Sequence, residues 1–316
     1  MTEPPGDRIL VTGALGQIGT ELVTSLRESF GKDNVLATDI RVPEEESSFP
    51  DGPFSNLSVL DGTGMEKMVL EEGIGTIFHL AAILSASGEK DPELCQRVNV
   101  GGTVCVLEAA RDFGLKVFAP SSIAVFGPDT PDIALQSSPL NPTTMYGNTK
   151  VTGEILGLNY WKQYGVDVRG IRFPGLISWK APAGGGTTDY AVDIFRAAVK
   201  YGHYECFVSE DTKLPMMYMS DAIRATERIM QADLENLGDS RAGYNIKGMS
   251  FTAGELADKI AEKIPEFTCD FVPDFRQKVA DSWPNDVDDQ PARDDWGWNA
   301  DYDLGRMVSE MISNIS

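Results

Sequence analysis

The sequence predicts an α/β fold, a doubly wound parallel sheet with a smaller C-terminal lobe, and three observations carry this prediction. Short apolar runs alternate with amphipathic segments through the first half of the 316-residue chain, which is typical of parallel strands joined by helices. A glycine-rich turn follows the first apolar run directly, at residues 13–19. An acidic residue, Asp39, ends the second apolar run, twenty residues after Gly19.

The alternation predicts the elements in order. We expect strands at residues 8–12, 34–38, 76–80, 116–120 and 166–172, and helices at 17–29, 64–72, 92–112, 143–164 and 189–201. Asn141 is a good N-cap for the fourth helix, and Pro142 is a good first residue for it. After residue 175 the pattern loosens, and residues 281–298 are irregular and acidic and contain three tryptophans.

The glycines of the turn are three residues apart, and each of the three positions has a physical reason to be glycine. Gly13 lets the chain turn sharply as it leaves the strand, Gly16 lets a pyrophosphate approach the backbone, and Gly19 lets the helix pack close to the strand. The helix N-terminus offers free N–H groups to the phosphates. These features predict a Rossmann dinucleotide-binding domain at residues 1–175. Residues 176–316 are expected to form mainly a substrate-binding lobe, interleaved with the last strands of the sheet.

Acidic and small residues at the strand ends indicate which dinucleotide binds. A carboxylate at Asp39 accepts hydrogen bonds from a ribose 2′-hydroxyl and repels a 2′-phosphate, which favours NAD over NADP. Asp61 follows a third short apolar run, where it is either an acceptor for the adenine amine or a helix cap. The small residues 80–82 let a cofactor lie against the backbone, and His79 before them is expected in the core without a chemical role.

A tyrosine and a lysine four residues apart suggest the chemistry. On the fourth helix, Tyr146 and Lys150 share one face, and an ammonium beside a phenol lowers the pKa of the phenol toward the working pH. Such a tyrosine removes the proton of a secondary alcohol while hydride leaves its carbon. Ser122, which follows Ser121 at the end of the fifth strand, is placed to hold the substrate oxygen. Asn99, inside the third helix, either binds a water of a proton relay or is exposed.

Composition excludes several classes of protein. The formal net charge of −21 argues against nucleic acid or an anionic membrane as a partner. No apolar run approaches the ~18 residues of a membrane span, and the first seven residues do not resemble a signal peptide. Four scattered cysteines indicate a reducing compartment, and two distant histidines argue against a metal site. The expected location is the cytoplasm, or the mitochondrial matrix if a leader has been removed.

These motifs together resemble the extended short-chain dehydrogenases/reductases. The matching segments are Thr12-Gly13-x-x-Gly16-x-x-Gly19, Asp39, Asp61, His79-Leu80-Ala81-Ala82, Asn99, Ser121-Ser122, Tyr146-x-x-x-Lys150 and Arg172-Phe173-Pro174-Gly175. Within that family the chain is similar to the short-chain L-threonine 3-dehydrogenases, through residues 11–19, 184–191, 214–219, 282–284 and 295–298. The resemblance implies NAD-dependent oxidation of L-threonine at C3 to 2-amino-3-oxobutyrate, without a metal, by a homodimer.

The resemblance also implies the site residues. Ser122, Tyr146 and Lys150 are the expected catalytic residues. The expected NAD-binding residues are Gly13, Gly16, Gln17, Ile18, Gly19, Asp39, Ile40, Asp61, Leu80, Ala81, Ala82, Asn99, Tyr146, Lys150 and Pro174. The expected substrate-binding residues are Ser85, Ser122, Tyr146, Thr187, Thr188, Asp189 and Trp283.

The chemistry of threonine is compatible with that set. Asp189 suits the ammonium, because a buried charge needs a partner. Thr187 and Thr188, at the start of a helix, suit the carboxylate, Ser85 adds a donor, and Trp283 caps the pocket. The alternative interpretations are simple helix capping at residues 187–189 and a core aromatic at Trp283.

Two other functions remain open from the sequence. One is a nucleotide-sugar epimerase or dehydratase, although Pro174-Gly175 stands where those enzymes commonly carry Phe-Asn. The other is a non-catalytic NAD-sensing protein.

A dimer is expected through residues 92–112 and 143–164, because these helices carry apolar residues on more than one face. These are Val98, Val100, Val104, Val106, Leu107, Ile155, Leu156, Leu158 and Trp161.

Overall fold

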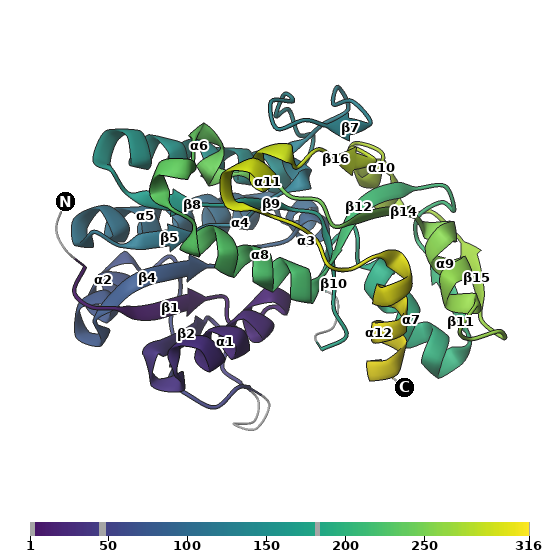
Figure 1. Ribbon diagram of the computed structural model, residues 1–316, viewed down its shortest axis with the longest axis horizontal. Coiled ribbons are helices and arrows are strands. Elements are labelled where there is room, and N and C mark those ends of the chain that lie inside the picture. Colours follow the sequence, from purple (N-terminus) through teal and green to yellow (C-terminus); the bar gives the residue numbers. More distant parts are fainter. Residues whose placement is uncertain (1–3, 44–48, 181–183, 316) are drawn as a thin grey trace.

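The structure is a computed structural model that describes residues 4–43, 49–180 and 184–315. Its largest sheet has six parallel strands in the order β3-β2-β1-β4-β5-β8, which confirms the predicted doubly wound arrangement (Figure 1). The strands of this sheet are β1 (Arg8–Thr12), β2 (Val35–Asp39), β3 (Phe54–Asn56), β4 (Ile74–His79), β5 (Lys116–Phe118) and β8 (Asp167–Arg169).

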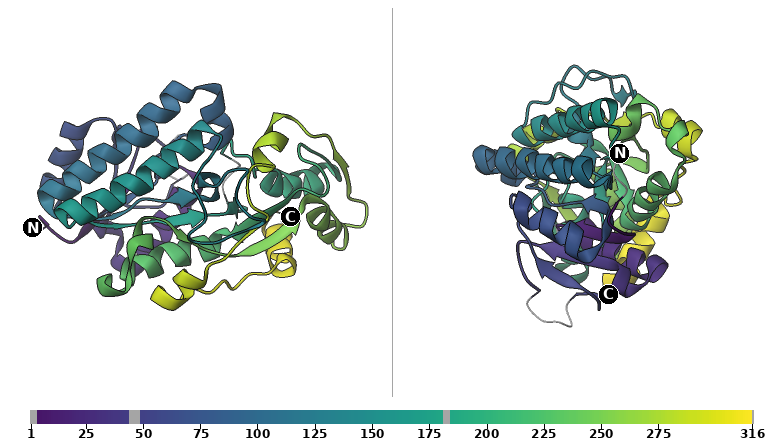
Figure 2. Two further views of the ribbon diagram at one scale, coloured as in Figure 1. Left: turned by 90° about the horizontal axis from the view of Figure 1, so that it is seen from above. Right: turned by 90° about the vertical axis from the view of Figure 1, so that its left-hand side faces the viewer.

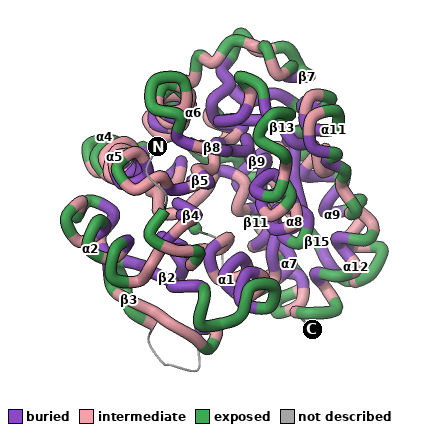
Figure 3. Tube along the Cα trace, turned by 60° about the vertical axis from the view of Figure 1, so that its left-hand side comes forward, coloured by how far each residue is buried: buried purple, intermediate pink, exposed green. Residues whose placement is uncertain are grey.

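Helices cover both faces of this sheet because its strands are apolar on both sides. On one face lie α2 (Gly62–Glu72), α5 (Gly102–Phe113) and α6 (Met145–Tyr164), with α5 and α6 side by side (Figure 2). On the other lie α1 (Gln17–Phe30) and α8 (Met219–Gln231) (Figure 1). Successive residues of β1 face opposite sides, so Leu10 packs in the core under α2 and α5 whereas Val11 packs in the core under α1. Strands β1, β2, β4, β5 and β8 are mostly buried, whereas the edge strand β3 is partly exposed (Figure 3).

The expected helix at 92–112 forms with one irregularity. It runs through α4 (Pro92–Gln96), a π-helical turn (Arg97–Gly101) and α5, and it follows the short helix α3 (Ser85–Lys90). Asp91 caps its N-terminus by accepting a hydrogen bond from Leu94 N. The π turn contains the buried Asn99, and such turns often occur at functional sites.

The second half builds a further core beside the sheet. Small sheets of order β10-β12-β14, β11-β15 and β16-β7 lie there, and β13-β9-β6 joins the two halves. These strands are β6 (Ser121–Ser122), β7 (Ile133–Ala134), β9 (Ile171–Phe173), β10 (Gly175–Ile177), β11 (His203–Cys206), β12 (Lys213–Tyr218), β13 (Tyr244–Asn245), β14 (Met249–Thr252), β15 (Thr268–Phe271) and β16 (Asp286–Val287). The helices are α7 (Tyr190–Tyr201), α9 (Ala253–Ala261), α10 (Phe275–Ala280), α11 (Gln290–Trp296) and α12 (Leu304–Ile315).

The start of α6 differs from the prediction. The N-cap is Thr144, whose Oγ1 accepts a hydrogen bond from Gly147 N at 3.0 Å. The expected cap, Asn141, instead donates from Nδ2 to Asp129 Oδ2 at 2.8 Å. Threonine caps nearly as well as asparagine, and the helix begins at Met145.

The strand expected at 166–172 is wrong as a single element. The chain forms β8 in the main sheet and β9 in a different sheet, with Gly170 between them. A Cβ at Gly170 would lie 2.4 Å from Ala242 O and 2.6 Å from Ala119 O, so the backbone is closely enclosed there. The close approach of these carbonyls marks the point where the chain leaves the first sheet.

The expected irregularity of residues 281–298 is also only partly correct. The segment contains β16 and α11, and α11 ends at Gly297 in the left-handed conformation. Trp296 and Trp298 pack in the same core as α1 and α8, so the second half contributes to the first. The expected domain organisation, with its division at residue 175, stays a prediction. Over the described ranges, no helix is long and apolar enough to cross a membrane, and the cytoplasmic location stays a prediction.

Candidate active site

A cavity of about 430 Å³ lies at the carboxyl ends of β1 and β4, where doubly wound sheets bind their ligands. Its walls come from both halves of the chain. The sequence-predicted residues that line it are Gly13, Gly16, Gln17, Ile18, Gly19, Leu80, Ala82, Ser85, Ser122, Tyr146, Lys150, Pro174, Thr187, Thr188, Asp189 and Trp283. The cavity therefore brings the glycine turn, the tyrosine–lysine pair and the expected substrate residues together.

The glycine turn forms one end of this cavity. Gly13 has φ +67°, and a Cβ on it would lie 2.6 Å from Ala81 N. A Cβ on Gly19 would lie 2.4 Å from Gly13 O, so only glycine fits where α1 meets the turn. No side chain caps the N-terminus of α1, and its first turn has no acidic residue. Gln17 Nε2 is buried without a hydrogen-bond partner among the described residues, so the turn fits an anionic diphosphate that accepts hydrogen bonds.

Asp39 supports the glycine turn from beneath the cavity wall. Its Oδ2 accepts a hydrogen bond from Leu15 N at 3.0 Å, and its Oδ1 accepts from Arg41 N at 3.0 Å and Arg41 Nε at 3.2 Å. Arg41, which the sequence analysis did not single out, lines the cavity in front of it. Asp39 itself is not among the lining residues, because these bonds turn its carboxylate toward the protein. Its contact with a ribose stays a prediction.

Two further expected cofactor residues lie outside the cavity. Asp61 is the N-cap of α2 and accepts a hydrogen bond from Gly64 N at 2.9 Å, so the capping interpretation is confirmed. Ile40 has 72% of its surface exposed and does not line the cavity. Neither residue lines the cavity, and their expected contacts with the cofactor stay predictions.

Tyr146, Lys150 and Ser122 meet at the centre of the cavity. Tyr146 and Ser122 are hydrogen-bonded, and Lys150 Nζ lies 5.6 Å from the centre of the Tyr146 ring. Lys150 Nζ donates to Pro120 O at 2.7 Å, and Ser122 Oγ accepts from Ala124 N at 3.2 Å. Backbone contacts therefore hold both partners of the tyrosine in place.

The pKa of the tyrosine shifts against the expected direction. Burial raises the pKa of Tyr146 to about 12, and the hydrogen bond from Ser122 opposes this rise. Burial lowers the pKa of Lys150 to about 8, while Cys95 and Glu154 oppose this fall. The expectation that Lys150 lowers the pKa of the phenol toward neutral pH is therefore wrong for these contacts. The free-energy cost of burying a phenolate outweighs the stabilisation that its neighbours give it.

Asn99 is buried, so the expectation of an exposed side chain is wrong. Its Oδ1 accepts from Ile83 N at 2.8 Å, and its Nδ2 donates to Ile83 O at 3.0 Å and Thr149 Oγ1 at 3.0 Å. Asn99 and Ala81 line a second, smaller cavity behind Lys150. Asn99 thus fixes the segment after β4 to α6, while its expected contact with a water stays a prediction.

His79 is a core residue, as expected. Its Nδ1 lies 2.9 Å from Thr12 Oγ1, and burial lowers its pKa to about 3. The described residues contain no group of three or more metal-ligating side chains. That the reaction needs no metal stays a prediction.

The far end of the cavity carries the expected substrate residues. Thr187 N donates to Ser85 Oγ at 3.1 Å, so it is not the free helix-start donor that was expected. Helix α7 begins only at Tyr190, because Asp189 serves as its N-cap residue. Asp189 Oδ2 accepts from Gly185 N and Gly186 N, both at 2.8 Å. Asp189 therefore holds the glycine segment 184–186, and burial raises the pKa of its carboxyl.

Trp283 combines the two interpretations that the sequence allowed. It is 9% exposed and belongs to the core of the second half, and it also lines the cavity. Sequence reasoning missed Ser87, Ile123 and Leu176, which line the same cavity. No local pattern marks these residues, because they lie in a short helix, a 3-10 turn and a strand that only the fold brings to the site.

Comparisons with known proteins agree with this geometry. The model of the NAD-dependent epimerase/dehydratase family matches residues 9–246. An uncharacterized epimerase/dehydratase of Staphylococcus aureus (strain USA300) is 48% identical over 310 residues, 98% of this chain and 96% of that protein.

Two solved structures are similar over nearly the whole chain. A GalE-like L-threonine dehydrogenase from Cupriavidus necator, in its holo form, is 47% identical with a TM-score of 0.94 and covers 98% of this chain and 100% of that chain. A monomeric L-threonine 3-dehydrogenase from a metagenome database is 50% identical with a TM-score of 0.94 and covers 97% of this chain and 98% of that chain. Because the family match covers more than half of the chain, the protein belongs to the NAD-dependent epimerase/dehydratase family, and its cofactor is NAD.

Proposed function

We propose that this protein oxidises L-threonine at C3 with NAD, giving 2-amino-3-oxobutyrate. The observation that carries the proposal is the shared cavity, which Tyr146, Lys150 and Ser122 line together with the glycine turn and Asp189. The similarity to L-threonine dehydrogenases over nearly the whole chain favours this substrate. The experiment below also tests a second class of substrate, the nucleotide-sugars.

Tyr146 is the proposed base. Its phenolate takes the proton of the C3 hydroxyl, while the hydrogen on C3 leaves with its electron pair. NAD, when bound, supplies the acceptor of that hydride. Ser122 donates a hydrogen bond to the substrate oxygen, and the charged Lys150 stabilises the phenolate that the buried site disfavours.

The charged groups of threonine suit the far end of the cavity. Oδ2 of Asp189 is bound by two backbone N–H groups, while the described residues give its Oδ1 no donor. We assign Oδ1 to the substrate ammonium. The hydroxyls of Thr187, Thr188 and Ser85 line the same cavity and retain hydrogen-bonding capacity for the carboxylate. Trp283 covers the site against water.

The direct test is formation of NADH from NAD and L-threonine, followed at the absorbance of NADH. We expect turnover with L-threonine and none with UDP-galactose, which is assayed for epimerisation in parallel. Epimerisation without threonine oxidation would establish the nucleotide-sugar function instead. Binding of NAD without either reaction would establish a non-catalytic NAD-sensing protein.

We also propose a homodimer through α5 and α6, which lie side by side on one face of the sheet (Figure 2). Val106 and Leu107 pack in the core and cannot contribute to it. Ile155, 55% exposed, remains available, and Val98, Val104 and Leu158 are half-buried. Sedimentation at micromolar concentration is expected to give a dimer, and an Ile155→Lys variant is expected to shift it to monomer. A monomer in the unmodified protein would contradict the proposal. It would match the similar protein that is described as monomeric.

A further inference from the structure

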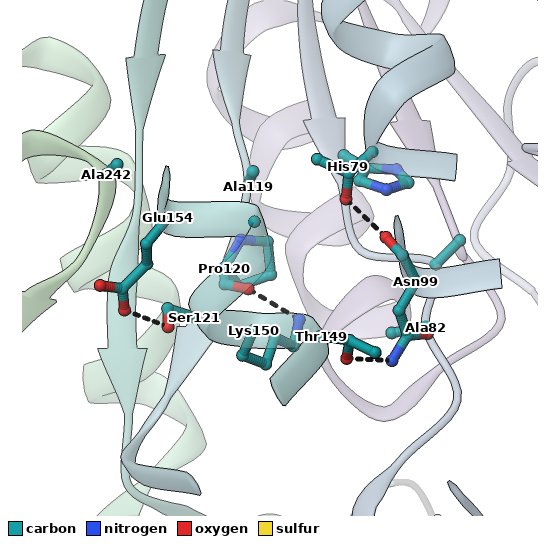
Figure 4. A pocket seen from close by; sticks show the side chains of 13 residues that line it. His79, Ala82, Asn99, Ala119, Pro120, Ser121, Thr149, Lys150, Glu154 and Ala242 are labelled. Carbon is teal, nitrogen blue, oxygen red and sulfur yellow. Dashed lines mark hydrogen bonds between the residues drawn. The ribbon is translucent and has the colours of Figure 1, made fainter. Parts of the chain in front are cut away.

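A small cavity lies behind Lys150, separate from the large one. Its volume is about 30 Å³, enough for one water molecule. Lys150, Glu154 and Ser121 line one side of it, and Asn99 and Thr149 line another (Figure 4). The lining includes polar side chains beside alanine and proline, and an internal water needs two to four polar partners. Glu154 and Lys150 therefore both line this small cavity.

Glu154 is held firmly at this cavity. Its carboxylate accepts hydrogen bonds from Arg172 Nε at 2.9 Å and Arg172 Nη2 at 2.8 Å, and from Ser121 Oγ (Figure 4). The Glu154 side chain is only 10% exposed. It lies four residues after Lys150, on the same face of α6. Gly243 makes the room, because a Cβ there would lie 2.4 Å from Glu154 Cδ.

We propose that Glu154 is a positioning residue for Lys150: its fixed carboxylate, linked to the ammonium through a water in the small cavity, keeps Lys150 charged beside Tyr146. This inference rests on the proposed function, in which Lys150 acts only in its protonated form. It assigns a role to a carboxylate that touches neither the large cavity nor its ligands. Ser121, which lines both cavities, donates its hydroxyl hydrogen bond to Glu154.

The charges around the pair support this role. Lys150 faces Tyr146 and Glu154 on α6, Cys95 on α4 and His79 on β4, and Arg172 on β9 faces Glu154. Burial lowers the pKa of Lys150 to about 8, and Cys95 and Glu154 both oppose it. Burial also raises the pKa of the Cys95 thiol, so Cys95 is neutral near neutral pH. His79 is neutral as well, and Glu154 is then the one of these neighbours that supplies negative charge to Lys150.

The role has a pH signature. The active combination is Tyr146 without its proton and Lys150 with its proton. Because the pKa of Tyr146 is about 12 and that of Lys150 is about 8, this combination grows with pH up to about 8 and is then constant. The bend in the profile of log kcat against pH therefore reports the pKa of Lys150.

The test compares Glu154→Gln with Glu154→Asp and a matched control, Glu227→Gln. Glu227 is also half-buried and also accepts a serine hydrogen bond, from Ser25 Oγ at 2.6 Å, but on the opposite face of the sheet. In Glu154→Gln we expect the bend to move down by about one pH unit and kcat above it to fall about tenfold. Below the bend kcat is expected to match the unmodified enzyme, because Lys150 is protonated in both. Glu154→Asp and Glu227→Gln are expected to keep the bend.

A direct measurement separates this inference from the proposed function. The pKa of Lys150 is read by NMR titration of ¹³C-labelled lysines, with the signal assigned by its loss in Lys150→Met. A downward shift in Glu154→Gln supports the link even if threonine is not the substrate. An unshifted pKa of Lys150, or an equal loss of kcat at every pH, would overturn the inference. Either result would mean that Glu154 acts only on the packing of the site. If Glu154→Gln does not fold, Gly243→Ala replaces it, because the added methyl displaces the carboxylate without removing it and is expected to shift the same pKa.

Discussion

Replacing Tyr146 with phenylalanine is expected to lower kcat for threonine oxidation about a thousandfold, while the affinity for NAD stays unchanged. The change removes one oxygen and keeps the ring in its place on α6, so the walls of the large cavity stay as they are. The hydroxyl is the only part of Tyr146 that exchanges a proton with the substrate. A thousandfold loss corresponds to about 4 kcal/mol of transition-state stabilisation.

The experiment measures kcat and KM at saturating NAD and, separately, NADH binding by fluorescence. Tyr164→Phe is the matched control, because Tyr164 lies at the end of the same helix with 51% of its surface exposed. Tyr164→Phe is expected to leave kcat and NADH binding unchanged. Near-normal turnover in Tyr146→Phe would falsify the assignment of the base, and weakened NADH binding would mean that the ring position had moved.

The parts of this site that local sequence rules specify were predictable. The turn between β1 and α1 needs glycine at fixed positions, because other residues would place a Cβ against the backbone of Ala81 or Gly13. A helix places Tyr146 and Lys150 on one face whatever surrounds it. The doubly wound parallel sheet was predictable from the alternation of strands and helices.

The parts that failed depend on contacts between distant segments. The single strand at 166–172 is broken because Gly170 lies between the carbonyls of Ala119 and Ala242, which no local pattern reveals. The hydrogen bonds that the Asp39 carboxylate accepts from Leu15 and Arg41 were not foreseen either, while its contact with a ribose stays a prediction. Asn99 was placed correctly on its helix, yet its amide is bound by Ile83, which approaches only after folding.

The pKa of Tyr146 illustrates the same limit. Sequence spacing brings a cation near the phenol, and proximity alone predicts a lowered pKa. Burial acts in the opposite direction, and its size depends on how tightly the two halves enclose the residue. The charge on Lys150 in turn depends on Glu154, whose place is set by Arg172 on a strand of another sheet. Electrostatics at the site is therefore a property of the assembled fold.

Substituting Gly19 with alanine is expected to weaken NAD binding about a hundredfold and to destabilise the fold by about 1–3 kcal/mol. The new Cβ would lie 2.4 Å from Gly13 O and 2.7 Å from Ala14 Cα, and both are backbone atoms that cannot rotate away. Helix α1 must therefore move away from the turn. The turn and the helix N-terminus together form the end of the cavity that we assign to the diphosphate, so their separation weakens binding.

Gly238→Ala is the control, because a Cβ at Gly238 would have no heavy atom within 4 Å. Both variants remove a glycine and its unfolded-state freedom, but only one introduces an overlap with the backbone. Thermal unfolding and calorimetric titration with NAD measure the two effects separately. If Gly19→Ala kept both the melting temperature and the affinity of the unmodified protein, the close contact between helix and turn would not be what positions the cofactor. If stability fell while affinity held, the contact would serve packing alone, and phosphate recognition would have to come from elsewhere in the cavity.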